Sequence, residues 1–521
     1  MNMKMKMLTA AVTAALGAGS AHAVNVSPDG HGQVLIMPYY TVQADNETLI
    51  SITNVTDQVK AIKVRFREAQ NSAEVLDFNL YLSPFDVWTA KITDSDADDG
   101  GAKLITNDNS CTVPTIPAEG VPFRNFVYAG LGDFTGDAGD QGMGRTSEGY
   151  VEVIEMGVVK AGSNPAKWAT HSKTTGVPVS CQSLNDWWTE LPAGEWTKDN
   201  SKDMLSPTGA VFGEINVINV QAGVEASEPV TVLDNFYTAP GDLHAAPGSG
   251  APTLADAAPK ESHVFVSGAV AVQDDEWDAA IDAVSAVLMS RLILNGYSVN
   301  PVVESQTEWV INFPTKHFYI NPASAAVLEP FTNNFTNHPS LGAGGGGAFE
   351  AVSTEYWDRE EREPQDPEDP TPPGEGPDFS PTLPPECIPG VDPDCTPKVL
   401  PWALPYEVNV VGFENDYMKS DFMSSQWASV NYALRHLEGT PDFRNGWAAV
   451  DLGPAYDSTG EQVTSDRQLV SKSGTVYTGL PVVGFMATIL QNSNVGDGAA
   501  YASTAEHRYV RSIEPAAVAP R

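Results

Sequence analysis

Hydrophobic and polar residues alternate along three consecutive runs near the start of the chain, between positions 35 and 92. A period of two predicts antiparallel strands that bury one face in a core and turn the other to solvent. Turn-forming residues at 54–58, 70–72 and 83–84 separate the runs. The apolar positions are Ile50, Ile52, Ile62, Val64, Phe66, Leu76, Phe78, Leu80 and Leu82, and the predicted solvent face carries Lys63, Arg65, Arg67, Asp77 and Asn79.

Further strand-like runs follow with turn signals between them, which favours a mainly β fold, an antiparallel β-sandwich with large insertions. One stretch has helical spacing instead, and we expect the resulting helix to cover a sheet or to present a groove-binding face to a partner. Its predicted cap is Asp274 or Asp275, and Asn295-Gly296 is its predicted stop. The helical positions are Trp277, Ile281, Val284, Leu288 and Leu292, and the strand-like runs are 150–156, 211–220, 229–236, 307–313, 317–320, 406–413, 446–452 and 481–490.

The pattern divides the chain into six segments. Proline and acidic residues dominate the fifth, which we expect to be an exposed extended segment, either a domain boundary or a long loop. The segments are 1–23 (signal peptide), 24–105 (N-terminal sandwich strands), 106–237 (second strand group with Trp-rich loops), 238–358 (linker, helix and strands), 359–401 (Pro-rich) and 402–521 (C-terminal strands).

Several stretches resemble secreted bacterial sandwich modules: "TLISITNVTDQVKAIKVRF" with "VLDFNLYLSP", and "GWAAVDL" with "GLPVVGFMATIL". The phrases "EGYVEVIEMG" and "EWVINFPTKHFYI" resemble an uncharacterised family of exported proteins from Gram-negative bacteria. The resemblance implies an immunoglobulin-like sandwich built from the first and last segments, and it implies no enzymatic role or substrate.

Charge and the N-terminal segment indicate the compartment. The chain has 29 basic and 67 acidic residues, a net charge of −38, which disfavours nucleic acid and anionic membranes as partners. Lys4 and Lys6, an apolar stretch at 8–19 and Ala21-His22-Ala23 have the form of a signal peptide, with Val24 as the expected mature start. No other apolar run reaches the roughly 18 residues of a membrane span. We therefore expect an exported protein at the cell surface, outside the cell or in the periplasm.

Four cysteines lie in the predicted exported part. An even count in an oxidising compartment predicts two disulfides, and four cysteines allow three pairings. We favour Cys111–Cys181 and Cys387–Cys395, because the second pair closes a short Pro-rich loop.

Two ligand sites are candidates. Asp94, Asp96 and Asp98 alternate in an acidic turn and could converge on calcium, although the turn departs from the EF-hand pattern and a solvated turn is the alternative. No other cofactor is expected. The tryptophans of one loop-rich region could stack on sugar rings if they are exposed, or fold onto the sandwich instead. They are Trp187, Trp188 and Trp196.

Signatures of catalysis are sparse. The sequence has neither a GxSxG nor an HExxH motif. Glu152 and Glu155 fall on opposite faces of a predicted strand, and His317 beside Lys316 is either catalytic or, as is commoner, structural. We therefore interpret the chain as a non-catalytic surface protein that meets a surface polymer, a polysaccharide or another exported protein. A carbohydrate-binding or adhesive module and a hydrolase with a site assembled from distant residues are the alternatives.

Overall fold

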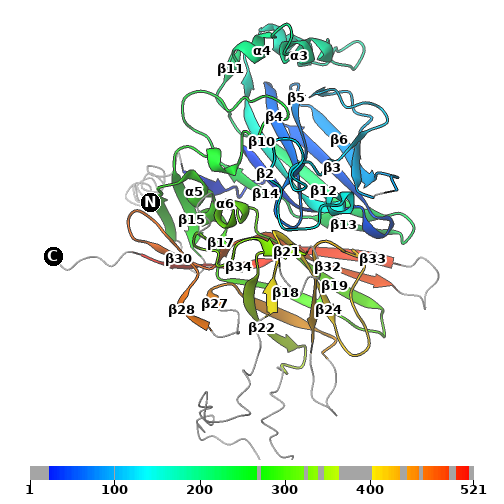
Figure 1. Cartoon of the computed structure of the whole chain (residues 1–521), viewed down its shortest axis with the longest axis vertical. Coiled ribbons are helices and arrows are strands. Elements are labelled where there is room, and N and C mark those ends of the chain that lie inside the picture. The colour runs from blue at the N-terminus through cyan, green and yellow to red at the C-terminus, as the bar shows by residue number, and fades with distance from the viewer. Residues whose placement is uncertain are drawn as a thin grey trace, which may run out of the picture.

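A computed structural model of the protein describes residues 23–98, 100–266, 271–321, 327–337, 345–362, 402–434, 443–456, 462–491 and 500–515. The fold is mainly β, and almost all of its strand pairs are antiparallel. Two sandwiches follow one another along the chain and lie against each other (Figure 1). Among the described residues, no helix is long and apolar enough to cross a membrane. The immunoglobulin-like topology stays a prediction.

The first sandwich consists of two sheets around an apolar core. The alternating residues Ile50, Ile62 and Phe66 all enter that core, as the pattern predicts. One sheet has the order β1 (Asn25–Val26), β14 (Thr231–Asp234), β2 (Val34–Thr41), β10 (Glu148–Val159), β4 (Val59–Glu68), β5 (Glu74–Leu82) and β8 (Cys111–Val113), with β11 (Met204–Leu205) on β10. The other has the order β13 (Val224–Glu228), β12 (Val211–Asn219), β3 (Glu47–Asn54), β6 (Val87–Asp94), β7 (Ala102–Ile105) and β9 (Val121–Pro122).

The first two alternating runs are strands, but they lie in opposite sheets. The turn between β3 and β4 is an arch that Asn54 holds together. Its side-chain amide donates to the carbonyls of Gln58 (2.7 Å) and Ser83 (2.9 Å). Its carbonyl oxygen accepts from the backbone N–H (3.0 Å) and the hydroxyl (2.7 Å) of Thr56.

The second sandwich is built from residues after position 288. One sheet has the order β23 (Trp402–Leu404), β22 (Glu350–Asp358), β26 (Asn445–Asp451), β18 (Leu292–Ser298) and β34 (Arg508–Val510). The other has the order β25 (Ser429–Ala433), β24 (Val408–Glu414), β19 (Ser305–Asn312), β32 (Val483–Gln491) and β33 (Ala500–Glu506), in which β24 and β25 are parallel.

This arrangement differs from the expected single sandwich of N- and C-terminal strands. The C-terminal strands β26 and β32 pair with β18, β22, β19 and β33, whereas β3, β4 and β5 find their partners before position 235. The two ends of the chain therefore contribute to different sandwiches.

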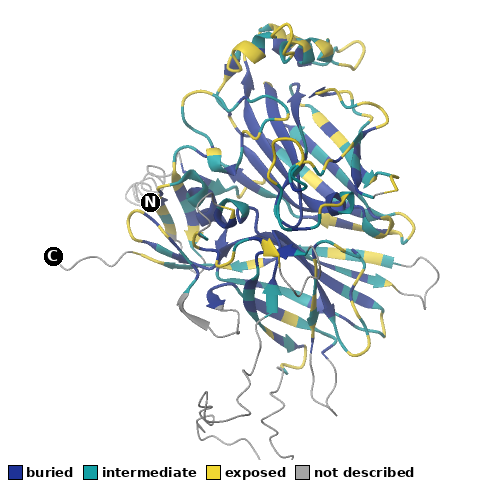
Figure 2. Cartoon of the chain, viewed as in Figure 1, coloured by how far each residue is buried: buried dark blue, intermediate teal, exposed yellow. Residues whose placement is uncertain are grey.

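The sandwiches share a continuous apolar interface. Val34 and Ile36 of β2 pack in one cluster with Val310 of β19 and Phe485 of β32. Every residue of β2, β4 and β10 is buried, so this sheet is covered on both faces (Figure 2). The shared core makes one body of the two sandwiches.

Helices are few and short. They are α2 (Asn164–Ala169), α3 (Cys181–Trp187), α4 (Glu195–Lys198), α5 (Ala280–Leu288) and α6 (His317–Ile320), with 3-10 turns η1 (Gln43–Asp45), η2 (Met143–Ser147) and η3 (Leu254–Asp256). Short strands complete the structure: β15 (Glu261–Val266) with β16 (Ala271–Glu276), β17 (Met289–Ser290) with β31 (Leu480–Pro481), β20 (Thr336–Asn337) with β21 (Gly346–Gly347), β27 (Pro454–Tyr456) with β28 (Gln462–Asp466), and β30 (Val476–Thr478) between β29 (Gln468–Val470) and β35 (Ser512–Glu514).

The predicted helix exists but is shorter at both ends. Asp275 lies in β16 and does not cap it; the carboxylate accepts hydrogen bonds from Ser471 (2.8 Å) and Tyr477 (2.8 Å). Asn295 and Gly296 lie in β18, because Leu292 has already begun a strand that pairs with β26. The helix covers the sandwich junction with Val284 and Leu288 in the shared core. The run 317–320, predicted as a strand, is helix α6.

Candidate ligand-binding pocket between the sandwiches

The charged face of β4 is buried, contrary to the prediction that it meets solvent. The segment after β14, which composition suggested was a linker, crosses this face, and its backbone carbonyls accept hydrogen bonds from the basic side chains. Lys63 Nζ donates to Ala246 O (3.0 Å) and Asp77 (2.8 Å). Arg65 donates to Pro252 O (2.6 Å) and Glu74 (2.7 Å).

Arg67 is the last residue of this row, and its guanidinium reaches a pocket. Its side chain is 8% exposed and pairs with Glu152 of β10 at 2.8 Å (Nε to Oε2). Nη1 donates to Ser72 O at 2.7 Å. Burial alone would lower the pKa of Arg67, but the adjacent Glu152 carboxylate raises it, so the group stays charged.

Three regions distant in sequence enclose the pocket, which has a volume of about 400 Å³. The first sandwich contributes the β4–β5 turn and the loop 127–137, and the segment after β14 contributes Gly248 and Gly250. The second sandwich contributes His317 and Asn321. Asn321 closes the junction by donating to Asn71 Oδ1 at 2.8 Å. The volume lies in the range of small-molecule sites, which commonly form between domains.

His317 lines the pocket and contacts the buried Glu407. Its Nδ1 lies 3.3 Å from Glu407 Oε1, and the His side chain is 14% exposed. Burial lowers the pKa of His317 well below 6.5 and raises the pKa of Glu407 well above 4.5. Burial therefore favours the neutral form of each group.

A buried arginine fixes the wall of the pocket. Arg145 donates to both carboxylate oxygens of Glu68 (2.7 and 2.8 Å) and to both of Asp137 (2.7 Å each). Its guanidinium also lies 4.3 Å from the ring centroid of Tyr128. These contacts tie the loop 127–137 to the end of β4, and so position Tyr128 and Asp137 at the pocket.

The predicted sugar-stacking tryptophans pack on one another. Trp196 is 1% exposed, and its ring lies 5.1 Å from Trp187, 5.6 Å from Trp188 and 5.3 Å from the stacked ring of Tyr81. Trp188 Nε1 donates to Tyr81 Oη (2.9 Å), which lies 2.8 Å from Nε2 of His244. The three indoles form the core of the α2–α4 segment at the far end of the first sandwich (Figure 1). Trp187 and Trp188 are half-buried and pack against the buried Trp196.

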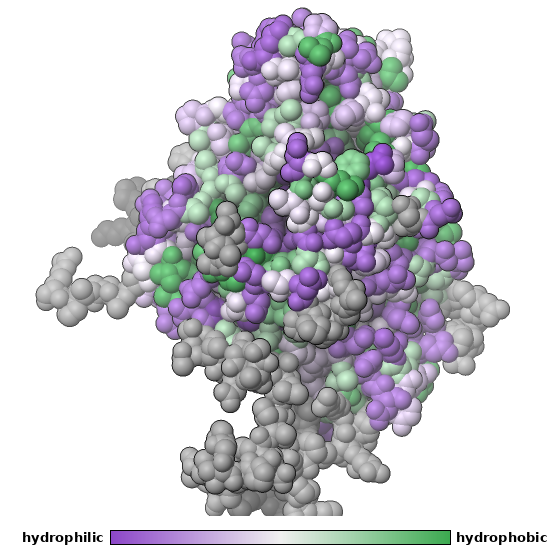
Figure 3. Space-filling model, viewed as in Figure 1, coloured by the Kyte–Doolittle hydropathy of each residue, from purple (hydrophilic) through white to green (hydrophobic). Residues whose placement is uncertain are grey.

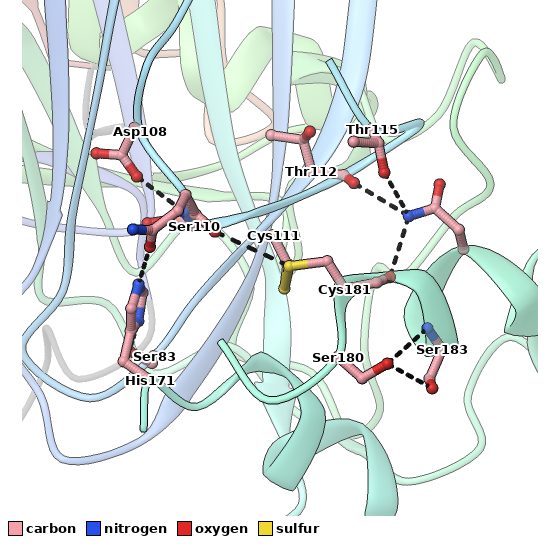
Figure 4. Close-up of a disulfide and its surroundings, with 12 residues drawn as sticks. Ser83, Asp108, Ser110, Cys111, Thr112, Thr115, His171, Ser180, Cys181 and Ser183 are labelled. Atoms are coloured by element: carbon pink, nitrogen blue, oxygen red, sulfur yellow. Dashed lines mark hydrogen bonds between the residues drawn. A yellow bond between two sulfur atoms is a disulfide. The ribbon is translucent and has the colours of Figure 1, made fainter. Parts of the chain in front are cut away.

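The predicted disulfide Cys111–Cys181 is confirmed and joins β8 to the first residue of α3 (Figure 4). Asn185, one turn along α3, donates to Thr112 O at 3.4 Å and to Thr115 Oγ1 at 3.0 Å beside it. Cys387 and Cys395 lie outside the described residues.

The three aspartates of the acidic turn, Asp94, Asp96 and Asp98, do not converge with one another in the structure. Asp96 pairs with Lys103, and Asp94 accepts the backbone N–H of Asp96 at 2.7 Å. In the described part of the chain, no three His, Cys, Asp or Glu residues, Asp98 included, lie in a group that could hold a metal ion.

From the sequence, His317 and Glu152 were considered separately as catalytic groups, Arg67 was assigned to solvent, and Ser72 and Glu407 were not singled out. The buried polar face is recognised only when β10 and β4 are considered together. In their register Glu152 lies opposite Arg65 and next to Arg67. A carboxylate among basic residues on a buried strand indicates a covered polar face. No family model, curated protein or solved structure matches this chain.

Proposed function

We propose that the chain is an exported, non-catalytic binding protein that holds a small polar ligand in the pocket at the sandwich junction. The observation that carries the proposal is the buried Arg67, whose guanidinium lines a pocket that only the contact of both sandwiches completes. The disulfide Cys111–Cys181 supports export, because such bonds persist in oxidising compartments.

The lining favours a neutral polar ligand about the size of one sugar residue. Arg67 and Asn321 supply hydrogen-bond donors, and Glu74 supplies an acceptor. Val127 and Phe134 supply an apolar wall. The charges are already compensated inside the protein, since Arg67 pairs with Glu152 and Glu74 pairs with Arg65. A ligand with strong net charge would therefore gain no unpaired partner.

The test is thermal-shift and calorimetric screening of the protein from Val24 onward with monosaccharides, polyols and neutral amino acids. A binder should stabilise the protein in proportion to RT ln(1 + [L]/Kd). Phe134→Ala removes the exposed wall of the pocket without touching the buried ion pairs, and should weaken binding at least ten-fold. Phe126→Ala is the matched control: its side chain is 48% exposed against 50% for Phe134, but it does not line the pocket.

Two results would overturn the proposal. One is a panel in which no compound shifts the melting temperature at millimolar concentration. The other is a binder whose affinity is the same in Phe134→Ala, in Phe126→Ala and in the unchanged protein.

A further inference from the structure

The outer face of the second sandwich carries a stacked pair of tryptophans. Trp357 of β22 and Trp447 of β26 are direct partners in the strand register. Their rings are nearly parallel, 16° apart, with centroids separated by 4.2 Å. Trp447 is 42% exposed, although its neighbour Ala448 faces the core and is fully buried. The pair therefore lies in the middle of a sheet but on its solvent side. Hydrophilic residues predominate over much of the coloured surface seen in Figure 3.

The stacking geometry determines where the free face of Trp447 is directed. The separation of the rings is close to the 4.7–4.9 Å between neighbouring strands. Both indoles must therefore stand upright on the sheet, with their planes facing across the strands. Trp357 covers one face of Trp447, so the other face is directed toward β18, the next strand on that side.

Glycine occupies the position on β18 that could have covered this face. Gly296 is the register partner of Trp447. A Cβ added at Gly296 would meet nothing closer than Gly446 O at 3.6 Å, which is ordinary van der Waals contact. Because partner residues project on the same side of an antiparallel pair, the missing side chain leaves a slot above Gly296 with the indole as its wall.

A row of polar side chains borders the slot. Ser298 and Asn445 are register partners two residues along from Gly296 and Trp447, about 6.8 Å away. The Ser298 hydroxyl also lies 2.6 Å from Oγ of the buried Ser305. Ser298 Oγ donates to Asn445 Oδ1 at 2.6 Å. Arg359 extends the row, because its backbone N–H continues the ladder to Asn445 O at 3.2 Å. Asn445 and Arg359 also line an open cavity of about 630 Å³ together with Asn300 and Glu360.

We propose that this face binds a carbohydrate chain, with one pyranose ring stacked on Trp447 above Gly296. A sugar ring has an apolar C–H face and a polar edge, and the site offers an aromatic plane next to amide, hydroxyl and guanidinium groups at the distance of one ring. Base-stacking ligands would meet the same indole, but they lack the many hydroxyls that the polar row would bind. The site is separate from the junction pocket, and neither proposal depends on the other.

The alternative is that the two indoles only stabilise the β22–β26 pair, as aromatic cross-strand pairs do. A substitution at Gly296 distinguishes the two roles. Gly296→Val should fold normally, because the backbone there is not in the left-handed region and the Cβ has room, but its side chain would fill the slot. A purely structural role predicts no effect of this substitution on binding, whereas Trp447→Ala could lower stability in either case.

The experiment is affinity electrophoresis and tryptophan-fluorescence titration of the full mature chain. The probes are cellohexaose, maltohexaose, laminarihexaose, chitohexaose and oligogalacturonate. At least one should quench or shift the fluorescence and retard the protein, and both Gly296→Val and Trp447→Ala should weaken binding ten-fold or more. Ser353→Val, a change on the same outer face of β22 but away from the slot, is the control and should bind as the unchanged protein does.

The proposal is overturned if none of the five probes binds, or if Gly296→Val binds a probe as tightly as the unchanged protein. Phe134→Ala, which tests the junction pocket, should leave oligosaccharide binding at this face unaltered. Loss of binding in Phe134→Ala, with Gly296→Val intact, would assign the sugar to the junction pocket and reject this site.

Discussion

The buried Arg145 should be the most costly charged residue to replace in the first sandwich. Its side chain is fully buried and donates four hydrogen bonds to Glu68 and Asp137, each between 2.7 and 2.8 Å. Burial alone would lower the pKa of Arg145, but the two carboxylates raise it, so the group stays charged. Charge-assisted bonds of this bidentate form are stronger than neutral ones.

The loss in the free energy of unfolding depends on the contacts that Glu68 keeps in Arg145→Met. Glu68 is fully buried, and removal of one partner of a buried ion pair costs about 3–5 kcal/mol. Glu68 keeps three backbone N–H donors, from Gln70 (2.7 Å), Asn71 (3.0 Å) and Ala73 (2.9 Å). We therefore expect Arg145→Met to lower the free energy of unfolding by about 3 kcal/mol, the lower end of that range. Arg145→Lys keeps the charge without the planar fork and should lose about 2 kcal/mol.

Equilibrium unfolding in guanidinium, followed by near-UV circular dichroism, measures these losses. Arg124→Met is the control: Arg124 is exposed and forms none of these carboxylate contacts, so its replacement should change stability by less than about 0.5 kcal/mol. A loss below about 1 kcal/mol in Arg145→Met would refute the reasoning, and so would an Arg145→Lys variant as stable as the unchanged protein.

Three further expectations concern other parts of the molecule. The disulfide Cys111–Cys181 spans 70 positions, so replacing both cysteines by serine should cost about 4 kcal/mol; an unchanged guanidinium midpoint would contradict this. Burial, and to a lesser degree nearby carboxylates, raise the pKa of Glu308 to about 8, so the folded state retains a proton that the unfolded state has released. The contribution of Glu308 to stability should therefore be most favourable below pH 4.5 and fall as the pH rises to about 8, and Glu308→Gln should remove this contribution from the pH profile. Trp196→Ala removes the centre of the indole cluster and should cost about 3–5 kcal/mol with loss of near-UV signal; retention of both would contradict the packing described.

Local alternation was sufficient to predict most strands but not their partners. The runs around Ile50 and Ile62 are strands because one face of each is apolar, which is information that each run carries alone. Whether two strands share a sheet depends on the path of the turn between them. At 55–58 that path is an arch held by the side chain of Asn54, and no spacing rule separates it from a hairpin.

The junction pocket was not predictable for a related reason. The charges of Lys63, Arg65 and Arg67 are typical of a solvated face when β4 is considered alone. Burial became possible because each cation has a carboxylate in register or close by, and because a segment rich in Ala, Gly and Pro supplies carbonyl acceptors. Small residues let that segment approach the sheet closely, so the composition that suggested a linker is also what a tight cover needs.

The tryptophans also show that local sequence does not determine which side chains are exposed. Density along the chain singled out Trp187, Trp188 and Trp196 as sugar-stacking candidates if exposed, but residues close in sequence on short helices can also pack their rings against one another. Trp357 and Trp447 are far apart in the chain and meet only through the register of β22 with β26. A slip of one residue in that register would turn one indole into the core, because side chains alternate between the faces of a strand. The exposed pair, and the slot that Gly296 leaves beside it, are therefore properties of the sheet rather than of any stretch of sequence.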